Sequence, residues 1–94
     1  MTPLVTPIPN LNGNSATSLI NQITDVMDTL RKAIDAYAKA SGDLTHGRNF
    51  QTVEDGEYQR QLGQDAIRER MMMLHVMHEE LQALALEIQR YDNR

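Results

Sequence analysis

The residues of this chain that could do chemistry lie in one string, MMMLHVMH, over residues 71–78. Met71, His75 and His78 follow one another at steps of four and three, so on a helix they lie within about 60° of one another. Thioether sulfur and imidazole nitrogen are ligands that suit copper. The same spacing is typical of side chains that pack against a neighbouring helix, and methionine commonly fills gaps in cores. We favour packing, and we expect neither a metal site nor a cofactor.

The other polar residues do not form a catalytic pattern. The chain has no cysteine, which excludes a thiolate nucleophile, a disulfide and a Cys-ligated zinc site. Glu79 and Glu80 are adjacent and diverge on a helix, while Glu54, Asp55 and Glu57 crowd the start of an expected helix, where acids favour the dipole. No Gly-rich phosphate loop and no nucleophile elbow is present. We therefore expect a protein that is not an enzyme.

Length and charge narrow the class of protein further. A chain of 94 residues forms at most one small domain. Its nine basic and thirteen acidic residues give a net charge of −4, without the basic cluster that phosphate-backbone binding requires. No apolar run approaches the length of about 18 residues that a membrane span needs. The N-terminus also lacks the pattern of a secretory signal peptide, so we expect a cytoplasmic protein that binds neither nucleic acid nor membrane.

Residues 1–14 form an apolar arm that contains all three prolines. Proline removes amide donors and fixes φ, so an extended arm is expected rather than a helix. Leu4, Val5, Ile8 and Leu11 make this arm unusually apolar, since disordered tails are usually polar and charged. We expect the arm to dock on helices, either those of its own chain or those of a neighbour.

The rest of the chain, residues 15–94, reads as one helical hairpin. Apolar residues recur at steps of three and four in two stretches, which predicts a helix over about 15–41, a connector over 42–53 and a helix over about 54–91. Ser15, or Asn14 before it, is the expected N-cap, and Gly42 stands where a glycine often ends a helix.

Two glycines leave the course of the second helix open. Gly56 and Gly63 each weaken a helix by up to about 1 kcal/mol relative to alanine, so the sequence leaves open a late start, a break or a continuous helix. A continuous helix would extend beyond the first one. Phe50, the only phenylalanine, is expected to plug the open end of the hairpin.

The apolar stripes of the two helices predict the seam between them. The predicted intra-hairpin core consists of Leu19, Ile23, Val26, Leu30, Tyr37, Leu74, Met77, Leu81, Leu84 and Ile88. Such spacing is typical of coiled-coil-like antiparallel packing. The predicted fold is therefore an all-α two-helix hairpin with an extended arm.

The second helix carries further apolar residues on its opposite side, and a helix with two apolar faces needs two partners. The predicted partner or oligomer interface consists of Met72, Met73, Val76, Ala83, Leu86 and, from the arm, Leu4, Val5 and Ile8. We expect this second face to complete a bundle, either with copies of the chain or with another helical protein. The function favoured by this pattern is a structural subunit, an adaptor or a small chaperone.

An alternative rests on the uncharged N-terminus, since no charged residue precedes Asp25. A stretch rich in Thr, Pro, Asn, Ser and Ile is similar in composition to type III secretion signals. A small helical hairpin also resembles the needle subunits of those machines and minor virion components of phages, although the connector lacks the proline-asparagine turn of needle subunits. This resemblance implies a protein exported without a cleavable signal peptide or incorporated into a particle.

Overall fold

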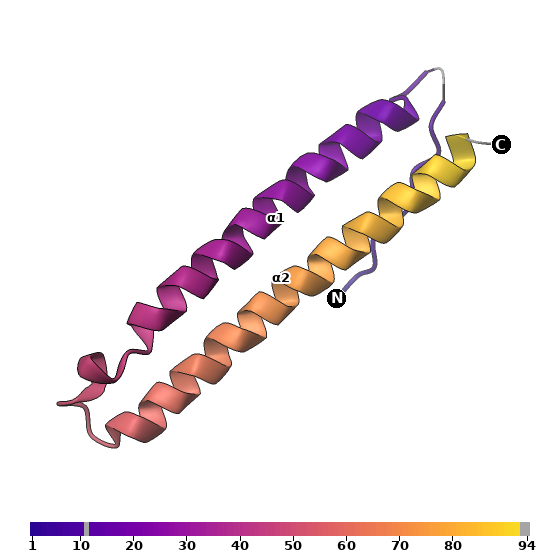
Figure 1. The fold of residues 1–94 in the computed structure, drawn as a ribbon. Coiled ribbons are helices and arrows are strands. Elements are labelled where there is room, and N and C mark those ends of the chain that lie inside the picture. Colours follow the sequence, from indigo (N-terminus) through magenta and orange to yellow (C-terminus); the bar gives the residue numbers. More distant parts are fainter. Residues whose placement is uncertain (11, 93–94) are drawn as a thin grey trace.

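The structure, a computed structural model, describes residues 1–10 and 12–92 and consists of two long antiparallel helices with an extended arm (Figure 1). α1 spans Ala16–Leu44, the short 3-10 helix η1 spans Gly47–Phe50, and α2 spans Gly56–Asp92. The described part of the chain contains no strand, so the predicted all-α two-helix hairpin is confirmed. Leu11 of the predicted arm and residues 93–94 of the predicted hairpin domain lie outside the described residues.

α1 begins at a serine cap and ends at a threonine cap. The Oγ atom of Ser15 accepts a hydrogen bond from the amide N–H of Ser18 at 3.1 Å, which satisfies one free donor of the first turn. The helix continues past Gly42 to Leu44, and no described glycine takes the positive φ with which helices often end. At Thr45 the amide N–H and the hydroxyl both donate to the carbonyl of Ser41, at 3.0 and 2.5 Å.

Close packing at the connector explains the glycine with which α2 begins. Asp55, directly before α2, has a φ of 52°, a left-handed conformation that aspartate adopts more readily than most residues. The carbonyl of Asp55 accepts a hydrogen bond from the amide N–H of Gln59 at 2.9 Å. A Cβ atom on Gly56 would overlap with the carbonyl oxygen of Phe50, so a larger residue would displace η1.

α2 runs without a break through Gly63, where the sequence left a break open. A Cβ atom on Gly63 would lie 3.3 Å from Cγ2 of Thr45, which is only 6% exposed. The glycine therefore lets the end of α1 pack closely against α2.

The seam between the helices follows a regular heptad-like spacing. Side chains at steps of four and three are half-buried or buried along α1 at Ala16, Ile20, Ile23, Met27, Leu30, Ile34, Tyr37 and Ser41. The matching series along α2 is Ile67, Met71, Leu74, His78, Leu81, Ala85 and Ile88. Spacing of this kind places one stripe of each helix against the other over the whole hairpin.

The seam lies roughly 50–60° around each helix from the predicted stripe, at about 100° per residue. Most of the predicted core residues are still half-buried or buried, because the two stripes overlap. Val26 and Met77, which were predicted inside the seam, are 49% and 37% exposed and lie at its edge. The displaced apolar flank of both helices faces the arm instead.

The hairpin has almost no enclosed core. Among the described residues only Ala16 and Ile88 are buried apolar side chains. The Cα radius of gyration is 19.2 Å, compared with about 12 Å for a compact domain of this length, and the long axis is 63 Å. The accessible surface is 7306 Å², compared with about 5,500 Å² for a compact monomer of the same mass. Two helices packed along one stripe thus leave much of their apolar surface exposed to solvent.

The arm lies alongside the C-terminal half of α2 in its own chain (Figure 1). Residues 1–10 form neither helix nor strand. Leu4 lines one hollow together with Val26, Met77 and Leu81, and a second hollow together with Leu84. The arm thus covers part of the apolar flank that the two helices leave exposed.

Candidate interaction surface

The string of methionines and histidines is divided between two sides of α2. Met71 and His78 lie in the seam and are half-buried, whereas His75 is exposed. The Nε2 atom of His78 is enclosed without a hydrogen-bond partner, and both histidines line a hollow with Arg31 and Asp35. In the described part of the chain, no three His, Asp or Glu side chains are placed to hold a metal ion. Met71 and His78 therefore pack in the seam between the helices, whereas the rest of the apolar string lies outside it.

An uncovered apolar surface lies on α2, the Met-rich patch, which we define as Met72, Met73, Val76 and Met77. Their exposed fractions are 62%, 59%, 46% and 37%. Together with Glu69 and Met1 they line a shallow hollow of about 440 Å³. By helical periodicity, Leu62 and Tyr58 continue the same side toward the start of α2, with 44% and 62% exposure. Asp65 and Glu69 lie on the same side between these two residues and the patch, so Leu62 and Tyr58 form a separate exposed apolar site.

The same side of α2 continues into the arm-covered end, which we define as Leu81, Ala83 and Leu84. Here Pro3, Leu4 and Thr6 of the arm line hollows together with α2 side chains. Leu81 and Leu84 are only half-buried even so. The arm demonstrates that this side of α2 accepts an additional apolar segment. The start of the arm reaches the edge of the Met-rich patch at Met77, while Met72, Met73 and Val76 stay largely exposed.

The other residues predicted for the partner interface lie elsewhere. Leu86 is 55% exposed, but it lies about 80° around α2 from Val76. Val5 and Ile8 of the arm are 83% and 64% exposed. The single predicted interface is thus divided between the Met-rich patch, the arm-covered end and separate exposed residues.

Carboxylates stand at both ends of the Met-rich patch. Glu69 lines the hollow of the patch, and Glu80 lines the adjoining hollow under the arm. Neither makes an ion pair with another described residue. The nearest cations in the sequence are engaged: Arg68 pairs with Asp65 at 3.3 Å, and Arg70 donates to a backbone carbonyl one turn earlier at 2.9 Å. The patch therefore has an acidic border.

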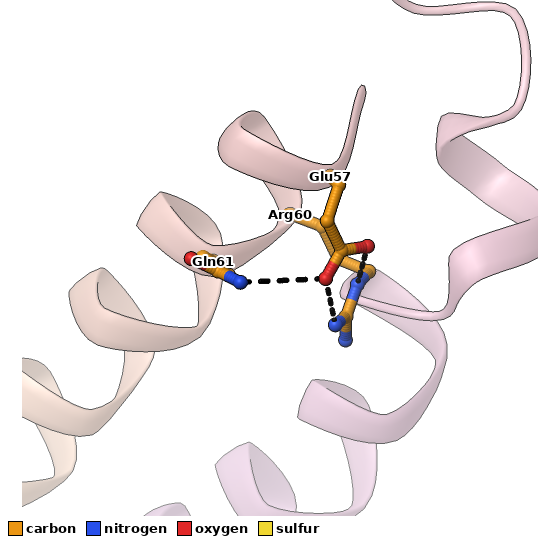
Figure 2. A network of polar contacts seen from close by, with 3 residues as sticks. All are labelled: Glu57, Arg60 and Gln61. Carbon is orange, nitrogen blue, oxygen red and sulfur yellow. Dashed lines mark hydrogen bonds and ion pairs between the residues drawn. The ribbon is translucent and has the colours of Figure 1, made fainter. Parts of the chain in front are cut away.

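A polar network stabilises the first turns of α2 (Figure 2). The guanidinium of Arg60 donates to both carboxylate oxygens of Glu57, at 3.0 and 2.6 Å, and the amide of Gln61 donates to one of them at 3.4 Å. The hydrogen bond from Arg60 is the main cause that lowers the pKa of Glu57, and the pKa of Arg60 is raised in turn. Glu57 and Gln61 are exposed and Arg60 is half-buried, and none of them lines the hollow of the patch.

The pattern of apolar residues in the sequence does not indicate the acidic border. A signal for it exists in the sequence, since Glu69 and Glu80 are eleven residues apart, which is three turns of a helix. They therefore lie on one line along α2, with the patch between them.

No protein-family model matches the chain, and no curated protein and no solved structure is significantly similar to it. Across the described residues, neither helix has an apolar stretch long enough to span a bilayer.

Proposed function

We propose that this protein is a helical interaction protein, in which the Met-rich patch of α2 packs against a helix of another polypeptide chain. In this account the protein acts as a structural subunit, an adaptor or a small chaperone, without catalysis. The observation that carries the proposal is the exposed Met-rich patch on a chain whose described residues enclose almost no core. Contiguous exposed apolar surface usually marks an interaction site.

The surface area supports the same proposal. The chain exposes about 1,800 Å² more than a compact monomer of its mass. Stable protein–protein interfaces bury about 800 Å² on each partner. A partner helix packed over the patch would therefore remove a large part of the excess. Methionine suits such a surface, because its flexible thioether side chain adapts to partners of different shape.

Site-specific photo-cross-linking in the native host tests the proposal. A photoreactive phenylalanine derivative at Met73 is expected to form cross-links to a helical segment of a second polypeptide chain. The matched control carries the same group at Gln82, which is exposed on the polar flank of α2. Equal cross-linking from both positions, or none from position 73, would contradict the proposal.

A companion variant separates binding from folding. Val76→Glu places a charge in the patch, where it is expected to abolish the cross-links from position 73. Val76 is 46% exposed, so the helix content measured by circular dichroism should stay unchanged. A loss of helix content in this variant would show that Val76 belongs to the hairpin's own core.

A further inference from the structure

We infer that the partner of the Met-rich patch is a basic amphipathic helix, with positively charged residues three turns apart on either side of an apolar stretch. The inference rests on the proposed function and specifies the chemistry of its partner. It is carried by the arrangement of Glu69 and Glu80 around the patch.

The distance between the two carboxylates sets the spacing of the partner's charges. Eleven residues of α2 correspond to about 16 Å along the helix axis. The four residues of the patch lie between them and supply the apolar contact. A partner helix with two lysines or arginines eleven residues apart matches both ends, and the match is the same for a parallel and an antiparallel helix. Leucine-sized residues between the two charges would fill the shallow hollow of the patch.

The same arrangement opposes a second copy of this chain. A twofold contact requires the same surface on both copies. If two α2 helices met antiparallel and centred on the patch, Glu69 would face Glu80 of the other copy, twice. If they met in parallel, each glutamate would face its own counterpart. Carboxylate against carboxylate is unfavourable at an interface, and within the described part of the chain neither glutamate makes an ion pair.

The test uses the full-length protein and two synthetic helical peptides with the same apolar face. One peptide carries lysines eleven residues apart at the edges of that face, and the other carries glutamates there. Fluorescence anisotropy of labelled peptide reports binding. The unaltered protein is expected to bind the lysine peptide at least about tenfold more tightly than the glutamate peptide, because two favourable charge pairs are replaced by two repulsive ones. Added salt should reduce this preference.

Charge reversal at the border makes the test specific. The double variant Glu69→Lys/Glu80→Lys is expected to prefer the glutamate peptide. The control Glu54→Lys/Asp92→Lys changes the net charge by the same amount at exposed positions away from the patch, and it should keep the original preference. If circular dichroism shows that the reversed variant has lost helix, Glu69→Gln/Glu80→Gln replaces it and should bind both peptides equally.

Two results would overturn the inference. One is an identical peptide preference in the unaltered protein and the border variants, and the other is no binding of either peptide. The proposed function fails separately, since it depends on cross-linking from position 73. Cross-links that join only copies of this chain would leave the proposed function standing and would contradict the basic partner.

Discussion

The Met-rich patch and the arm-covered end are two parts of one side of α2, and they differ in what lies over them. At the arm-covered end, Leu81 and Leu84 are half-buried beside Leu4 of the arm. In the patch, Met72 and Met73 are 62% and 59% exposed, although they are as apolar as the covered residues. Apolar sequence alone thus does not distinguish a surface that the chain covers itself from one that it leaves open. In the proposed function, the arm-covered end stabilises the hairpin and the Met-rich patch binds the partner.

The largest expected difference between the two regions concerns stability. Ile88 lies near the arm-covered end and is fully buried, so Ile88→Ala should lower the free energy of unfolding by about 3 kcal/mol. Val76→Ala in the patch removes an exposed side chain and should change it by no more than about 0.5 kcal/mol. Urea unfolding followed by circular dichroism measures both. Equal losses in the two variants would abolish the distinction between the regions.

The arm provides a finer version of the same test. Leu4 is 50% exposed and packs on α2, so Leu4→Ser should lower the free energy of unfolding by about 1 kcal/mol. Its neighbour Val5 is 83% exposed, and Val5→Ser should have almost no effect. Urea unfolding of this matched pair reports whether the arm covers its own hairpin. If neither substitution changes stability, the arm does not pack on α2 of the same chain.

A polar substitution within the patch should reduce the binding of apolar molecules and leave the free energy of unfolding unchanged. Met73→Gln keeps the length of the side chain and removes its apolar character. We expect the free energy of unfolding to stay within about 0.5 kcal/mol and the binding of a hydrophobic fluorescent dye to fall. Leu84→Gln, at the arm-covered end, should instead lower stability. A Met73→Gln protein that unfolds more easily would place Met73 in the core.

The smallest expected effect comes from the first turns of α2, where contacts are polar. Because Arg60 lowers the pKa of Glu57 below its ordinary value of 4.5, the ionised carboxylate stabilises the folded state. This contribution is present above the ordinary pKa and is lost as the pH falls through the lowered pKa. Glu57→Gln should therefore slightly lower the thermal midpoint at neutral pH, and the difference from the unaltered protein should disappear in acid. A difference that persists in acid would point to another cause.

The sequence predicted the hairpin well, because helix periodicity and capping are local. The steps of three and four identified both helices, and Ser15 is the cap that its type predicts. The end of α1 was less predictable, since Gly42 can end a helix or continue it, and Thr45 supplies the final hydrogen bonds. Gly56 was expected to weaken α2, but the close approach of the Phe50 carbonyl explains its presence.

The orientation of the helices around their axes was harder to predict. Leu74, Leu81 and Ile88 belong both to the predicted stripe and to the observed seam. Apolarity favoured Met77 between them, whereas the seam includes the polar His78. The choice depends on the arm, which covers the flank at Met77 and whose extended chain has no periodicity to show where it docks. The position of the exposed patch therefore follows only from the arrangement of α1, α2 and the arm together.

Methyl NMR of the methionines during titration with the lysine peptide is the most direct test of the central claim. The six methionines report on different regions: Met72, Met73 and Met77 lie in the patch, Met27 and Met71 lie in the seam, and Met1 lies at the end of the arm. We predict that the methyl signals of the three patch methionines shift on binding, while those of Met27 and Met71 stay in place. Shifts concentrated on the seam methionines, or no shift in the patch, would contradict the assignment of the Met-rich patch as the binding surface.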